Sequence, residues 1–352
     1  MAFGVGFTHN LEQAYGFLVE HYRPGDRICL IGFSRGAFTA RAVAGMIHMC
    51  GVLRPTHAAL IPYVSRIYQG AKFGAAGKVK STYAWRPGDA EVEHWGAHDH
   101  PAVDFLGVWD TVASIGVFCK RKTLPYTTEN PSVIETRQAL AIDERRAYFQ
   151  PKLCTSRDGK RVRQVWFPGV HADVGGGYRG QERGLARTSL MWMLQELLPG
   201  IDPVAGEYPA ELVKIDGEAY RREVMNDAEE PPWFDPEAER HRSLRGAWWA
   251  IEALPMNYAV YTREWFIPGA HPRTPWPGDA IHSSAVERAA ATSYELREDF
   301  EAANFPRSRG RAGCRRRLTL SESRRSRLPA QRCRFEKTDS RLNRRGFQRP
   351  SS

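Results

Sequence analysis

The first apolar pattern along the chain predicts a helix, a buried strand and a second helix in close succession. Residues 10–22 carry apolar side chains near helical spacing, which is typical of an amphipathic helix. Residues 27–33 are short, apolar and bounded by glycine, as expected of a buried strand in a parallel sheet. Residues 36–50 again follow a helical pattern, and Gly51 supplies a stop. A sharp turn must therefore join the strand to the helix that follows it.

Later segments repeat this alternation of strands and helices. Residues 102–109 and 162–167 are predicted as buried strands, and residues 131–149 and 185–198 as helices. Strands that alternate with helices favour a mostly parallel sheet with helices on both faces. We therefore expect an α/β protein whose core occupies residues 1–200.

Two further regions differ from this core in composition. Residues 201–305 contain long stretches rich in Trp, Pro and charged side chains, and we expect an irregular, lid-like insertion followed by the end of the core domain. Residues 306–352 hold 16 Lys and Arg against 3 Asp and Glu. Such a segment buries too little apolar surface to offset the entropy lost on folding, so we expect a disordered Arg-rich tail.

The positive net charge of the chain comes from the residues of this tail. The whole chain holds 50 Lys and Arg and 40 Asp and Glu, a formal charge of +10, so the part before the tail is nearly neutral. The tail contains no recognisable nucleic-acid-binding module, and no nucleic-acid partner is expected. The alternative is a basic-tailed nucleic-acid binder, whose affinity would fall steeply with salt.

Several other classes of protein are disfavoured. No run approaches the ~18 uncharged apolar residues of a membrane-spanning helix, and no export signal opens the chain. The six cysteines are scattered without a CxxC pair, which suits reduced thiols in the cytoplasm better than a disulfide frame or a metal site. No glycine motif for nucleotide phosphates is present. We expect a cytoplasmic protein that uses neither metal nor cofactor, and its oligomeric state is left open.

The predicted turn after the first strand has the sequence G-x-S-x-G, with Ser34 at its centre. This arrangement exposes a serine hydroxyl between a strand and a helix, as the nucleophile of a serine hydrolase requires. The backbone amide of Arg35 would then point at the developing oxyanion, beside the positive end of the helix. The alternative is a Gly-rich turn in which Ser34 only caps the helix.

A serine nucleophile needs a histidine base and a carboxylate that orients the base. Asp110 and His171 each follow a predicted buried strand, in the chain order serine, acid, histidine that is usual for such hydrolases. The alternatives are that Asp110 caps the next segment and that His171 is structural. Asp173 stays a rival for the acid and His282 a rival for the base.

These segments resemble the DUF2235 family of α/β-hydrolases in sequence, order and spacing. The resemblance covers roughly residues 5–200, with a fainter match at residues 281–283. The segments that carry it are Pro24–Arg27, Gly32–Arg41, Gly107–Val112, Ala141–Arg146 and Pro168–Tyr178.

The resemblance implies an incomplete α/β-hydrolase-like fold and hydrolysis of carboxylic esters, including lipid or phospholipid esters. It implies catalysis through Ser34, Asp110 and His171, although a late histidine motif of the family keeps His282 open. The family includes phospholipase effectors of bacterial type VI secretion, so delivery by that route is an expectation beside a housekeeping role. A transient contact with a membrane surface, for example through residues 248–251, is a further expectation.

One departure from the family pattern concerns the start of the chain. Family members begin with a strand and an Asp-Gly-Thr-rich motif upstream of the nucleophile, and we expect this chain to lack those first strands. Part of the oxyanion hole of such hydrolases comes from a loop in that region. The alternative function is therefore a catalytically inactive remnant that binds a partner through an exposed sheet edge.

Overall fold

The computed structural model describes residues 6–73, 79–80, 97–98, 100–112, 123–156, 161–178, 183–198, 235–254, 267, 269–275 and 279–296. Contacts divide the chain into residues 1–307 and residues 308–352, and every described residue belongs to the first unit. The tail predicted for residues 306–352 lies outside the described residues. Residues 201–234, the first part of the expected insertion, lie outside them as well.

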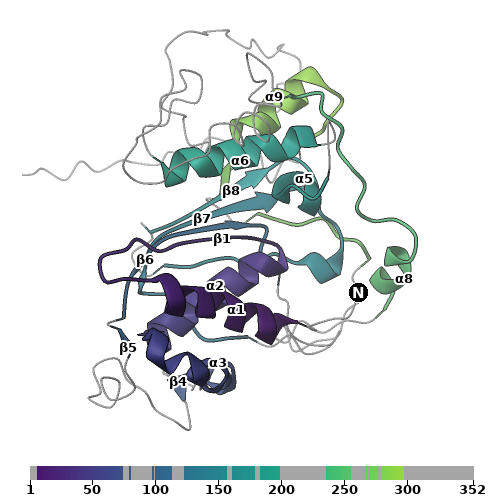
Figure 1. Cartoon of the computed structure of the whole chain (residues 1–352). Helices are drawn as coiled ribbons and strands as arrows, with labels where there is room; N and C mark the ends of the chain where they lie inside the picture. Colours follow the sequence, from purple (N-terminus) through teal and green to yellow (C-terminus); the bar gives the residue numbers. More distant parts are fainter. Residues whose placement is uncertain are drawn as a thin grey trace, which may run out of the picture. The chain divides into compact units, whose positions relative to one another are not determined.

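The central element is a five-stranded parallel sheet in the order β1-β6-β7-β8-β9 (Figure 1). The register aligns the carboxyl ends of the first four strands: Phe33 pairs with Trp109, Trp109 with Ala139, and Ala141 with Phe167. Side chains that directly follow these strands therefore meet at one edge of the sheet. The strands are β1 (Cys29–Phe33), β6 (Val103–Trp109), β7 (Val133–Ala141), β8 (Val162–Phe167) and β9 (Ala280–Ile281).

Helices cover both faces of this sheet (Figure 1). On one face lie α1 (Phe7–His21), α2 (Arg35–Cys50) and α3 (Ile61–Gly70), and on the other lie α6 (Gly184–Leu197) and α9 (Ser283–Ala291). Alternate residues of β6 serve the two sides: Leu106 and Val108 join the core under α1 and α2, whereas Phe105 and Trp109 join the core under α6. The predicted α/β fold with helices on both faces is thus confirmed.

Short elements complete the described part of the chain. Two antiparallel pairs are formed by β2 (Val52–Leu53) with β5 (Ala97–His98) and by β3 (Lys72–Phe73) with β4 (Val79–Lys80). The remaining helical turns are η1 (Pro55–Leu60), η2 (Ala147–Phe149), α5 (His171–Gly175) and α8 (Trp248–Glu252).

The helix predicted over residues 131–149 is wrong, because its first half is the central strand β7. This strand is hydrogen-bonded on both sides, to β6 and to β8. Its carboxyl half is fully buried, and a strand covered on both faces loses the alternation that would distinguish it from a buried helix. The bounds of the other predicted strands and helices agree with the structure within a few residues, and the strand at residues 162–167 has the predicted bounds. The predicted burial of the first strand is wrong, because β1 lies at one end of the described sheet and none of its residues is buried.

Candidate active site

Ser34 occupies a strained turn between β1 and α2. Its φ of 58° and ψ of −118° lie outside the conformations that most residues adopt. Its amide donates a hydrogen bond of 2.9 Å to the carbonyl oxygen of Trp109 on the neighbouring strand, which fixes the turn to the sheet. A Cβ atom at Gly32 would lie 2.5 Å from the carbonyl oxygen of Gly36, so only glycine permits the chain to double back this tightly.

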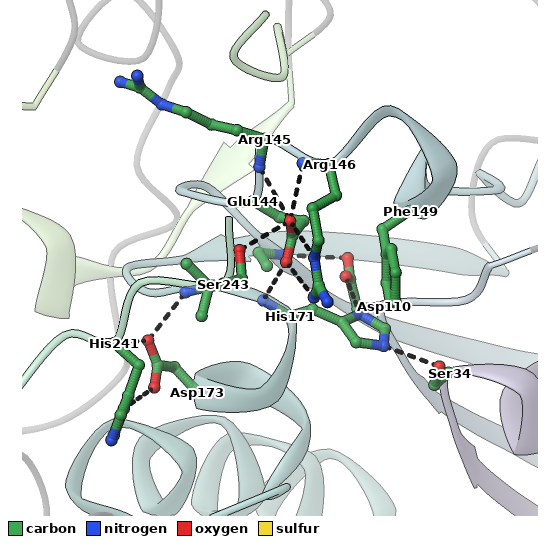
Figure 2. Close-up of polar contacts among 12 residues, drawn as sticks. Ser34, Asp110, Glu144, Arg145, Arg146, Phe149, His171, Asp173, His241 and Ser243 are labelled. Atoms are coloured by element: carbon green, nitrogen blue, oxygen red, sulfur yellow. Dashed lines mark hydrogen bonds and ion pairs between the residues drawn. The ribbon is translucent and has the colours of Figure 1, made fainter. Parts of the chain in front are cut away.

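The structure brings Ser34, His171 and Asp110 together in one hydrogen-bonded chain (Figure 2). The hydroxyl of Ser34 lies 2.7 Å from Nε2 of His171. Nδ1 of the same ring lies 2.6 Å from Oδ2 of Asp110. If Nδ1 carries the proton and donates to the carboxylate, then Nε2 is left with a lone pair for the serine proton. This is the geometry that general-base activation of a serine requires.

Two aromatic rings and one buried acid hold His171 in this position. Its ring contacts those of Phe33 and Phe149, with centroids 4.6 and 4.8 Å away. The backbone amide of His171 donates to Oε2 of Glu144, which lies at 3.3 Å. Glu144 is fully buried, and its other oxygen accepts the backbone amides of Arg145 and Arg146 at 3.0 and 2.9 Å (Figure 2). The loop after β7 and the start of α5 are therefore fastened to each other.

Asp110 is fully buried and shares its carboxylate between His171 and Arg273. The Arg273 guanidinium approaches both carboxylate oxygens, at 2.6 and 3.0 Å. It also donates to the backbone oxygens of Ala141 and Phe149. Burial would raise the pKa of Asp110, but the Arg273 charge and the hydrogen bond from His171 outweigh burial and hold this pKa well below its usual value. Asp110 is therefore an anion across the physiological range.

The rival acid, Asp173, contacts a different histidine. Its Oδ1 lies 2.6 Å from Nδ1 of His241, and its Oδ2 accepts the backbone amides of Val170 and His241 (Figure 2). The ring of His241 also stacks on Tyr178 with a centroid distance of 3.6 Å. Burial raises the pKa of Asp173, against the opposing effect of these hydrogen bonds. Asp173 thus ties residues 240–243 to α5 rather than orienting His171.

The rival base, His282, serves as the N-cap of α9. Its Nδ1 accepts from the backbone amide of Ser284 at 3.2 Å and lies 2.9 Å from the Ser284 hydroxyl. Its ring stacks on Phe167, and burial together with the Arg163 charge lowers its pKa to about 4. None of its contacts among the described residues reaches Ser34 or Asp110.

Arg35, the predicted oxyanion donor, is the first residue of α2. The first amides of a helix have no partner within the helix, so this amide is available to a ligand beside the serine hydroxyl. No group of three His, Cys, Asp or Glu side chains close enough to hold a metal ion occurs in the part of the chain that the structure describes. No helix in that part is long and apolar enough to cross a membrane.

Four residues around the site were not predicted from the sequence: Glu144, Phe149, His241 and Arg273. Glu144 lies in the segment Ala141–Arg146, which carries part of the family resemblance, so the sequence does give a signal for this residue. His241 and Arg273 lie in the region that the sequence pattern left irregular, and no local signal marks them. Arg273 is 163 residues from Asp110 along the chain.

The fold and this edge of the sheet define an α/β protein in which a serine, a histidine and an aspartate are hydrogen-bonded at the carboxyl ends of parallel strands. The chain belongs to the family described as T6SS phospholipase effector Tle1-like, catalytic domain, whose model matches residues 1–196.

Three relatives give the extent of the likeness. The chain is 31% identical over 163 residues to the uncharacterized protein YEL023C of Saccharomyces cerevisiae, and this match covers 43% of the chain and 22% of that protein. A crystal structure of an uncharacterized protein from Pseudomonas aeruginosa has 21% identity and a TM-score of 0.28, over 54% of this chain and 26% of the other. The Tle1 effector, solved bound to the VgrG spike of the type VI secretion system, has 19% identity and a TM-score of 0.28, over 55% and 40%. The chain thus spans about a fifth of the curated relative's length.

Proposed function

We propose that the chain is a serine esterase that hydrolyses carboxylic esters of lipids, including phospholipids. The observation that supports this most directly is the continuous hydrogen-bonded chain from Ser34 through His171 to Asp110, with donor–acceptor distances of 2.7 and 2.6 Å. Family membership supports the lipid class of the substrate.

In the proposed reaction His171 accepts the proton of the Ser34 hydroxyl while the serine oxygen bonds to the acyl carbon. The negative charge moves to the carbonyl oxygen, which the Arg35 amide stabilises. His171 then returns its proton to the departing alcohol, leaving an acyl-serine. Water adds by the same route and releases the fatty acid. Asp110 stays ionised and orients the imidazole throughout, since Arg273 keeps its pKa low.

The test is hydrolysis of p-nitrophenyl esters and of a phospholipid, in parallel with labelling by a serine-directed fluorophosphonate. Ser34→Ala should abolish labelling and reduce turnover by roughly four orders of magnitude or more. The matched control is Ser132→Ala, because the Ser132 hydroxyl also lies 2.6 Å from a histidine nitrogen, Nδ1 of His48, but outside the strained turn. Labelling should persist in that variant. A folded wild type with neither labelling nor turnover would refute the proposal and favour a non-catalytic binding protein.

A further inference from the structure

A pocket of about 420 Å³ lies where the loops after β7 and β8 meet residues 240–249. Ligands of α/β proteins bind at this position, outside the carboxyl ends of the strands. Its walls include Val170, which precedes His171 directly, and three arginines, Arg145, Arg240 and Arg242. Trp249 adds an indole ring that is 57% exposed.

Residues 240–243 form one wall because three of these four residues are bonded to acidic side chains. Arg240 pairs with Asp143 at 2.9 Å, and the Ser243 hydroxyl donates to Glu144 at 2.9 Å. His241 pairs with Asp173, as described above. The wall is thus a fixed part of the site, and the charge of Arg240 is already neutralised.

For the other two arginines of the pocket, the described part of the chain provides no such partner. Arg145 and Arg242 are exposed, and no described residue accepts a hydrogen bond from, or forms an ion pair with, either guanidinium. Figure 2 shows Arg145 pointing away from His171, with Glu144 between them. Two uncommitted guanidinium groups in one pocket favour an anion, and their planar donor forks match the oxygens of a phosphate group.

Residues that line the pocket and His171 are bonded to the same side chain, Glu144. Glu144 accepts the Arg145 amide and the Ser243 hydroxyl with one oxygen and the His171 amide with the other. Next to Trp249, the Trp248 ring packs on Phe149, which in turn contacts His171. A group held in the pocket therefore lies against residues that also hold His171 in place.

We propose that this pocket binds the phosphodiester of a phospholipid headgroup through Arg145 and Arg242. The assignment rests on the proposed function in one respect, that the ester to be cleaved belongs to a lipid. It goes further in assigning recognition of the phosphate to two residues outside the Ser34–His171–Asp110 chain.

The experiment compares two substrates with the same acyl chains, dihexanoylphosphatidylcholine and dihexanoylglycerol. The variant is Arg145→Gln with Arg242→Gln, since neither guanidinium has a hydrogen bond or ion pair to lose among the residues that the structure describes. Loss of two exposed charged contacts should lower the ratio of kcat/KM for phospholipid over diglyceride roughly 2- to 30-fold. The diglyceride rate should not change. The control is Arg54→Gln with Arg66→Gln, which removes two exposed arginines near α3 and should leave the ratio unchanged.

Binding to Ser34→Ala by calorimetry tests the pocket without catalysis, using dihexanoylphosphatidylcholine and inorganic phosphate as separate probes. The lipid should bind, and the two arginine substitutions in this background should weaken it by a similar factor. An unchanged substrate ratio, or an equal loss on both substrates, would overturn the proposal. So would phosphate binding as tight as that of the lipid, which would indicate a site for the free anion. If wild type hydrolyses nothing, the esterase proposal fails, but weaker lipid binding in the arginine variant would still support the pocket assignment, and equal or absent binding would overturn it.

Discussion

Replacing Arg273 by Met should expose how strongly the buried Asp110 carboxylate depends on its partner. The pair is almost completely excluded from solvent, since Arg273 is 4% and Asp110 0% exposed. Removing one member of such a pair leaves an uncompensated buried charge, which typically destabilises a protein by about 3–5 kcal/mol. The backbone oxygens of Ala141 and Phe149 lose a donor as well. We expect a loss near the upper end of this range at neutral pH.

The loss of unfolding free energy should also depend on pH, in a direction set by the ionisation of Asp110. In the wild type its pKa is depressed, so the stability it contributes is present above the unfolded value of about 3.9 and is lost only as pH falls through the lower folded value. Without Arg273, the largest influence that opposes burial is lost and only His171 still lowers the pKa of Asp110, so this pKa should rise above its wild-type value. The variant then protonates Asp110 at mildly acid pH and relieves part of the penalty. The difference in unfolding free energy between the two proteins should therefore narrow from about pH 7 to about pH 4.5.

Urea unfolding followed by tryptophan fluorescence at the two pH values measures this difference, provided that both proteins show the same dependence on urea. Arg27→Met is the control, because Arg27 is 56% exposed in its pair with Asp104 and should contribute only about 0–1 kcal/mol. If the variant does not fold, Arg273→Lys retains the charge without the planar fork and should give an intermediate loss. A loss below about 1 kcal/mol for Arg273→Met, or a loss that does not vary with pH, would refute the reasoning.

Three further results are expected. Gly32→Ala should lower kcat roughly 100-fold or more because its Cβ would meet backbone at 2.5 Å, whereas Gly36→Ala, with no atom within 4 Å, should match wild type in the same ester assay. His241→Ala should lower the melting temperature yet keep fluorophosphonate labelling of the folded protein, whereas His171→Ala should abolish labelling of the folded protein. Burial lowers the pKa of Lys152 to about 7, so its penalty is complete below pH 7 and is relieved as pH rises toward the unfolded value of about 10.4. Lys152→Met should therefore stabilise the protein more at pH 6 than at pH 10 in urea unfolding.

The features that could be predicted from the sequence are those set by short-range pattern and by the geometry of parallel strands. Ser34 lies in a turn whose flanking strand and helix both have clear periodicity. Asp110 follows a buried strand and His171 comes shortly after another, and carboxyl ends of parallel strands meet at one edge of a sheet. Proximity of the three residues follows from topology alone. Their catalytic roles stay part of the proposed function.

The choice between neighbouring candidates depended on geometry that a sequence does not contain. His171 and Asp173 are two residues apart on the short helix α5, and two residues of an α-helix are rotated by about 200°. They therefore face opposite directions, one toward Ser34 and the other toward His241. The strand β7 was missed for a related reason, because its neighbours in the sheet, and not its own residues, decide its conformation.

The contacts of the site extend well beyond the segment that carries the family resemblance. The family match ends at residue 196, yet the buried partners of Asp110 and Asp173 are Arg273 and His241. The strand β9, which pairs with β8, also lies beyond that limit. A core confined to residues 1–200 would leave two buried carboxylates without their cations or donors and β8 without its outer neighbour. Because an unpaired buried charge outweighs most other single changes, we infer that His241, Arg273 and β9 belong to the same folded unit as the site and that the family-matched segment alone does not hold a stable site.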